Sequence, residues 1–237
     1  MIIKPMQARI GILCWEVGQV PRGLMQLEGL VGNSTNPASY TYPVRFHPVM
    51  GANAQTILLN PSQKVLGTMI EDARMLVAEG VAAITTSCGF NAVFQRQLAA
   101  SVDVPVMSSS LMQVPLLQQA LAPGAEICVI TANAGALRPE HFAGAGIQSL
   151  DTVHVVGLEQ YPEWNRIFSD PQRDIDLGIV ECEVVDAAQR ALKLHPGIRA
   201  FVLECTDLPP FSANIRAATG LPVMDFITMI DYLNACL

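Results

Sequence analysis

Clusters of basic residues are absent from this sequence of 237 residues. Its 14 Lys and Arg residues are scattered singly, and the formal net charge is −7. Because binding to nucleic-acid phosphates needs grouped Lys and Arg side chains, the sequence argues against a nucleic-acid partner. Charged residues make up only 15% of the chain and hydrophobic residues 51%, a composition typical of a well-buried α/β protein.

Long hydrophobic runs are missing as well. No apolar stretch approaches the roughly 18 residues that a membrane-spanning helix needs, although the mean hydropathy is positive. Residues 1–9 lack the architecture of a signal peptide, because their short apolar start leads directly into polar residues. We therefore expect a cytoplasmic protein without a membrane partner.

The sequence also lacks recognisable motifs for binding metals or cofactors. The sequence has no C-x-x-C pair, no Cys/His spacing of a metal site, no Gly-rich dinucleotide motif and no PLP-lysine pattern. We expect free thiols, no metal and no cofactor, so that catalysis would depend on side chains alone. The histidines share no spacing, and we expect each to be structural; they are His47, His141, His154 and His195. The cysteines are Cys14, Cys88, Cys128, Cys182, Cys205 and Cys236.

Short apolar runs rich in β-forming residues alternate with helix-like segments along the whole chain. This alternation predicts parallel sheets built from β-α-β units. Two dipeptides, Asn60-Pro61 and Asp170-Pro171, have the form of a helix cap followed by proline and predict helix starts. The predicted strands are residues 9–15, 81–86, 104–107, 126–131, 154–158, 198–203 and 221–224, with residues 40–49 as an edge segment.

A repeat with an offset of 117 residues (205 − 88) relates the two halves of the chain. Between residues 80–112 and residues 197–229, nine of 33 ungapped pairs are identical, whereas chance gives about two. The offset aligns Cys88 with Cys205. It predicts two similar α/β halves related by an approximate two-fold axis.

The two aligned cysteines each follow an apolar strand and precede a helix-like segment. Ligands of parallel α/β sheets bind at this end of the strands, and helix N-termini there favour a thiolate. We expect Cys88 and Cys205 to face each other across a cleft between two lobes. The first lobe would comprise residues 1–107 with 222–237, and the second residues 108–221.

The segments Ser87-Cys88-Gly89-Phe90-Asn91 and Glu204-Cys205-Thr206-Asp207-Leu208-Pro209 resemble the cysteine motifs of the aspartate/glutamate/hydantoin racemase superfamily. The resemblance covers essentially the whole chain. It implies two flavodoxin-like lobes with a cleft between them, cofactor-independent catalysis and a homo-oligomer, most often a dimer. The acidic residue after the second Cys-Thr is closer to the aspartate racemase pattern than to that of glutamate racemases, which usually have His there.

Two thiols on opposite faces of a small substrate suit the removal of a proton from one face and its return on the other. We therefore expect an isomerase, a racemase or epimerase of an amino acid, an aspartate- or glutamate-like compound or a hydantoin, with Cys88 and Cys205 as the catalytic pair. Residues expected to bind the substrate are Cys14, Ser87, Gly89, Asn91, Thr131 and Thr206. Glu204 and Asp207 would tune the second thiol or cap the helix after it.

The residues leave several alternatives open. Arg22 and Arg45 are candidate partners for a second substrate carboxylate. A maleate-type cis–trans isomerase would use Cys88 as a nucleophile on a double bond, and an arylmalonate-type decarboxylase would need only one cysteine. A two-lobed sensor of small molecules would bind without turnover.

Overall fold

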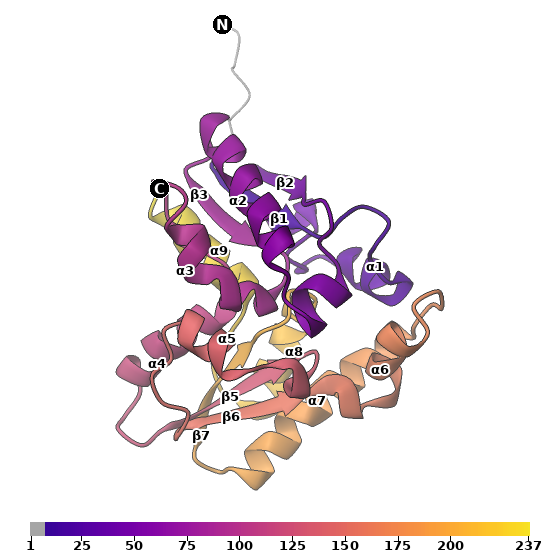
Figure 1. Ribbon diagram of the computed structural model, residues 1–237. Helices are drawn as coiled ribbons and strands as arrows, with labels where there is room; N and C mark the ends of the chain where they lie inside the picture. The colour runs from indigo at the N-terminus through magenta and orange to yellow at the C-terminus, as the bar shows by residue number, and fades with distance from the viewer. Residues whose placement is uncertain (1–7) are drawn as a thin grey trace, which may run out of the picture.

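Two α/β lobes, each built on a four-stranded parallel sheet, make up the computed structural model, which describes residues 8–237 (Figure 1). The strand orders are β2-β1-β3-β4 and β6-β5-β7-β8, which confirms the predicted α/β class with two similar lobes. Residues 1–7, for which the sequence predicted no signal peptide, lie outside this range. The strands are β1 (Ile10–Cys14), β2 (Val44–Pro48), β3 (Ala83–Thr86), β4 (Val106–Met107), β5 (Glu126–Thr131), β6 (Val153–Gly157), β7 (Ile198–Leu203) and β8 (Val223–Met224).

Helices cover the faces of both sheets (Figure 1). Within residues 8–237, none of them is long and apolar enough to cross a membrane. A 3-10 helix, η3 (Gly89–Phe94), directly follows Cys88. The α-helices are α1 (Arg22–Glu28), α2 (Gln63–Ala78), α3 (Gln95–Ala99), α4 (Val114–Ala120), α5 (Pro139–Gly144), α6 (Pro162–Ser169), α7 (Leu177–Leu194), α8 (Ser212–Thr219) and α9 (Phe226–Ala235).

The 117-residue offset relates matching elements of the two lobes. It places β3 on β7, β4 on β8, and α2 on most of α7. In each lobe the strand that leads to a cysteine is a central strand, paired on both sides in parallel. Both cysteines therefore lie at the carboxyl end of an equivalent strand, as the sequence predicted.

The chain returns to the first lobe only after β8. Val223 and Met224 pair with β7 in the second sheet, whereas the predicted boundary placed residues 222–237 together in the first lobe. The next helix, α9, does pack on the first sheet, since Phe226 and Met229 lie in one buried cluster with Ile10. The crossing thus falls between β8 and α9.

Both predicted helix starts are wrong, because each dipeptide begins where a preceding helix ends. Asn60 is the C-terminal cap of the π-helix Ala54–Leu59, and α2 begins three residues later, with Ser62 as its N-cap. Asp170 likewise ends α6, a helix that the sequence did not predict. Asp176 is the true N-cap of α7, since its side chain accepts backbone N–H groups of the first turn.

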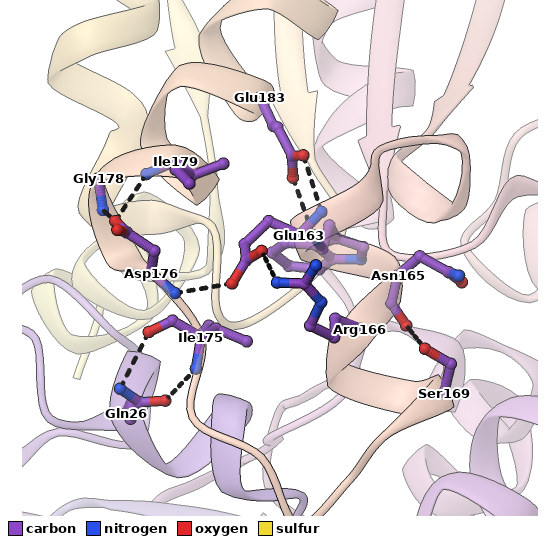
Figure 2. A network of polar contacts seen from close by, with 11 residues as sticks. Gln26, Glu163, Asn165, Arg166, Ser169, Ile175, Asp176, Gly178, Ile179 and Glu183 are labelled. Atoms are coloured by element: carbon purple, nitrogen blue, oxygen red, sulfur yellow. Dashed lines mark hydrogen bonds and ion pairs between the residues drawn. The ribbon is translucent and has the colours of Figure 1, made fainter.

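Polar contacts fasten α1 of the first lobe to the segment between α6 and α7 of the second. The amide of Gln26 donates to the carbonyl of Ile175 at 3.2 Å and accepts from the Ile175 N–H at 2.7 Å (Figure 2). Next to it, the Glu163 carboxylate accepts from the N–H of Asp176 at 2.8 Å. Glu183 accepts the N–H groups at the start of α6, so the segment is fixed from both sides.

Candidate active site

A pocket lies between the two lobes at the carboxyl ends of β3 and β7. Residues 87–90 line it from the first lobe and residues 204–207 from the second. Helix α1 contributes Leu24 and Glu28, and α6 contributes Phe168, so the helices joined by the network of Figure 2 form part of its wall. This is the strand end at which parallel α/β sheets bind ligands.

Most of the site residues predicted from the sequence line this pocket, and the two cysteines are among them. Cys14, Asn91 and Thr131 are not among its lining residues. The Cys14 thiol donates to the carbonyl of Ile12 at 3.4 Å, and burial raises its pKa to about 12. Roles for the predicted residues in the reaction stay predictions. The predicted residues that line the pocket are Ser87, Cys88, Gly89, Glu204, Cys205, Thr206 and Asp207.

Cys88 is buried at the start of η3 with hydrogen-bond donors around its sulfur. Burial raises the pKa of its thiol well above the usual range, and the charge of Glu204 raises it further. The backbone N–H of Phe90 and the indole N–H of Trp15 face the sulfur and oppose this shift. The indole N–H has no hydrogen-bond partner among residues 8–237. Two N–H groups near Cys88 thus favour its thiolate, but burial and the charges of Glu204 and Asp207 disfavour it more strongly.

Cys205, in contrast, has a carboxylate next to its sulfur. Its thiol donates to Oδ2 of Asp207 at 3.6 Å, and Nδ2 of Asn33 donates to Oδ1 of the same carboxylate at 2.8 Å. Burial raises the pKa of Asp207 to about 6, while these two hydrogen bonds lower it. Asp207 is therefore mostly ionised at neutral pH and placed to accept the thiol proton, while burial and the charge of this carboxylate raise the pKa of the Cys205 thiol well above its usual range. The 117-residue offset puts Phe90 at the equivalent position of the first lobe, where the side chain cannot accept a proton.

Glu204 is a buried carboxyl group between the two cysteine loops. Its Oε2 accepts from the Thr131 hydroxyl at 2.7 Å, while Oε1 has no partner within residues 8–237. Burial raises its pKa to about 8, so that the group is mainly protonated at neutral pH. A Cβ atom at Gly89 would lie 2.3 Å from Oε1, which means that only glycine allows this close approach.

The remaining wall of the pocket is acidic and aromatic. Glu28 lines it, and burial raises the pKa of this carboxyl to about 7, with the charge of Asp207 adding to the effect. Trp15, Phe90 and Phe168 supply aromatic rings. Among the described residues that line the pocket there is no Lys or Arg.

Both arginines considered as carboxylate partners lie outside this lining. Arg22 donates to Asp174 at 3.1 Å, and Nε of Arg45 lies 3.8 Å from Glu79. Both side chains are largely exposed. Neither of these two candidates lines the pocket.

Sequence reasoning missed Asn33, Glu28 and Phe168. Asn33 lies 174 positions before Asp207, and Phe168 belongs to a helix that the sequence did not predict. No spacing or motif connects these residues to the cysteines. They are identified only from the tertiary structure, in which α1, the loop after it and α6 pack near the pocket.

Curated proteins similar to this chain include dimethylsulfoniopropionate lyases. The chain is 32% identical over 209 residues to the dimethylsulfoniopropionate lyase of Durusdinium sp. clade D, covering 86% of this chain and 69% of the relative. It is 33% identical over 216 residues to dimethylsulfoniopropionate lyase 3 of Emiliania huxleyi, covering 87% of this chain and 56% of the relative. The chain thus spans only about half to two thirds of these relatives' length. No family model matches it.

Comparison with solved structures gives proteins of other activities. Allantoin racemase from Klebsiella pneumoniae aligns with a TM-score of 0.61 at 15% identity, over 97% of this chain and 89% of that one. An aspartate racemase homologue from Pyrococcus horikoshii also gives 0.61, at 17% identity and over 97% and 99% of the two chains. Unliganded arylmalonate decarboxylase gives 0.52 at 16% identity, over 96% and 92%. At such identities, these likenesses show the fold alone.

The relatives correct the activity predicted from the sequence. The predicted resemblance to the racemase superfamily is confirmed for the fold, whereas the predicted racemase or epimerase activity and isomerase class are wrong. The proteins that share about a third of their residues with this chain are named lyases. The cysteine motifs place two thiols at a cleft, and such thiols do not by themselves decide how the reaction proceeds after proton removal.

Proposed function

This chain belongs to the family of the dimethylsulfoniopropionate lyases, and we propose that it cleaves dimethylsulfoniopropionate, or a close sulfonium carboxylate, by β-elimination. The observation that carries the proposal is the composition of the pocket. It combines two cysteines with acidic and aromatic side chains, and no Lys or Arg occurs among its described lining residues. Such a pocket fits a substrate with a cationic sulfonium group.

The chemistry needs one proton transfer and one bond cleavage. A thiolate removes the proton on the carbon next to the substrate carboxylate, and the C–H electrons form a C=C bond. The bond between the β-carbon and sulfur breaks, and its electron pair leaves with neutral dimethyl sulfide. Acrylate and a protonated thiol remain. Racemisation begins with the same proton removal, which explains how one fold supports both reactions: the leaving group on the β-carbon decides the outcome.

The walls of the pocket supply the recognition of the sulfonium group. A cation near the faces of Trp15, Phe90 and Phe168 is attracted by the ring quadrupoles, and Asp207 adds negative charge, as does Glu28 in its ionised form, which a nearby cation favours. A dicarboxylate such as aspartate would meet these carboxylates with a second negative charge of its own. The electrostatics therefore favour a cationic substrate over an acidic amino acid.

We assign the base to Cys205 because its thiol has a carboxylate to take its proton. Asp207, held by Asn33, accepts the thiol proton and leaves the thiolate that attacks the substrate C–H. Glu204 is mainly protonated at neutral pH, and its Oε1 has no partner within residues 8–237, so it can donate a hydrogen bond to the carboxylate as enolate charge develops. Cys88 then acts by shaping and polarising the pocket, since elimination needs no second thiol to return a proton.

Release of dimethyl sulfide tests the proposed function directly. Purified protein incubated with dimethylsulfoniopropionate should release dimethyl sulfide, measured by headspace gas chromatography, together with one equivalent of acrylate. The neutral thioether 3-(methylsulfanyl)propionate is the control substrate, and it should give no product because its leaving group would be an anionic thiolate. A folded protein that forms neither product from dimethylsulfoniopropionate would refute the proposal.

Reversing the charge of Glu28 should weaken substrate binding. In Glu28→Lys, we expect KM for dimethylsulfoniopropionate to rise about tenfold or more, which corresponds to about 1.4 kcal/mol, because an ammonium replaces a carboxylate beside the sulfonium. The value of kcat should change much less. Glu71→Lys, an exposed position on α2, is the matched control and should keep the KM of the unchanged protein. Equal KM values in both variants would contradict a sulfonium group near Glu28.

Two further expectations from the sequence belong to this proposal. We propose that the enzyme works in the cytoplasm, and that it forms a homo-oligomer, most simply a dimer. Light scattering during size-exclusion chromatography measures the second point.

A further inference from the structure

Three metal-ligating side chains meet at the end of the second sheet that is remote from the pocket. Glu126 is the first residue of β5, His154 is the second residue of β6, and His195 follows the last residue of α7. Thr131, at the pocket end of β5, is five residues further along the strand, which is about 17 Å at 3.3 Å per residue. The cluster is therefore separate from the proposed active site.

The geometry of the cluster is compact. Nε2 of His154 lies 2.9 Å from Oε2 of Glu126. Within the part of the chain that the structure describes, neither atom has a hydrogen-bond partner. The ring of His195 stacks on that of His154, with centroids 3.7 Å apart and planes inclined by 18°. One ligand atom from each of the three residues lies within 4.8 Å of the others.

The surroundings suit a cation that enters from solvent. The His154 and Glu126 side chains are 24% and 30% exposed, whereas the facing atoms Nε2 and Oε2 are buried, so water can reach an ion there once a ring has turned. His195 is the C-terminal cap of α7, and the partial negative charge of a helix C-terminus attracts cations. Arg190 lines the same surface hollow, but it is paired with Asp186 at 2.7 Å.

We propose that Glu126, His154 and His195 form a binding site for a divalent transition-metal ion of the Zn²⁺ type. Two neutral imidazoles and one carboxylate are ligands that such ions accept in tetrahedral sites, with water in the fourth position. Imidazole lone pairs lie in the plane of the ring, so one ring turns out of the stack when the ion binds. The bound ion joins β5, β6 and the end of α7, and it stabilises the second lobe without contacting the pocket.

Zinc binding to the chain with Cys182→Ser and Cys236→Ser tests this site, because both of these thiols are exposed and would compete for the metal. Titration calorimetry with Zn²⁺ should show one equivalent, and the melting temperature should rise on addition of Zn²⁺. In this background, His154→Gln and His195→Gln should each weaken zinc binding at least about tenfold. Mutating a residue that only hydrogen-bonds a metal ligand already costs that much. His47→Gln is the matched control on the first sheet and should leave binding unchanged.

The rate of dimethyl sulfide release should stay the same in both histidine variants, since the site is remote from the pocket. Failure of the proposed lyase function would leave this inference untouched, because its readouts are heat and melting temperature. Saturable binding that keeps its affinity in His154→Gln and His195→Gln would overturn it, and zinc held by the thiols of the pocket would behave in that way. Absence of saturable zinc binding would overturn it as well.

Discussion

Cys205→Ser should lower kcat for dimethyl sulfide release by about 10³-fold or more, whereas Cys88→Ser should keep a clearly measurable part of it. A hydroxyl is a far weaker acid than a thiol, so serine cannot supply the base, and loss of a general base costs about 10²- to 10⁴-fold. Elimination leaves the abstracted proton on the enzyme. A second thiol on the other face of the substrate therefore has no proton to deliver.

Comparing the two serine variants decides whether Cys205 or Cys88 is the base. Rates of acrylate formation, followed by ultraviolet absorbance, give kcat and KM for each variant, and circular dichroism confirms that both are folded. We expect Cys88→Ser mainly to alter KM, because Cys88 lines the pocket beside Trp15 and Phe90. If Cys88→Ser is the inactive variant and Cys205→Ser the active one, the base is Cys88. The proposed role of Asp207 as acceptor of the thiol proton is then wrong as well.

Asp207→Asn should lower kcat about 10²-fold and remove the acidic limb of the pH–rate profile. In the proposed mechanism, Asp207 accepts the Cys205 proton only when it is ionised, and burial raises its pKa to about 6. The rate should therefore fall about tenfold for each pH unit below about 6. It should also fall above about 8, where Glu204 loses the proton with which, in the proposed mechanism, it hydrogen-bonds the substrate.

Two variants sharpen this test. The hydrogen bond from Asn33 lowers the pKa of Asp207. Asn33→Ala removes it, so the pKa of Asp207 should rise and the acidic limb of the profile should move to higher pH. Asp103→Asn changes the same functional group at an exposed position and should keep the complete profile. An unchanged acidic limb in Asp207→Asn would show that another group controls it.

The sequence was sufficient for much of the fold because the signals for it are local or repeated. Alternating strands and helices, together with the 117-residue offset, predicted two similar parallel α/β lobes, and the strand ends at Cys88 and Cys205 follow from the same pattern. Helix starts were harder to place. Asn60 and Asp170 satisfy the rules for a cap, but a cap residue can end one helix as well as begin another.

The sequence by itself determined the two lobes, the alternation of strands and helices within them and the two thiols at one cleft, because hydrophobic period and internal repeat are properties of the linear chain. Only the tertiary structure decided how the two thiols differ. Packing of α1 and the loop after it brings Asn33 to Asp207 and Glu28 to the pocket, and strand pairing brings His154 to Glu126. These residues are far apart along the chain, so no spacing could have indicated that they meet.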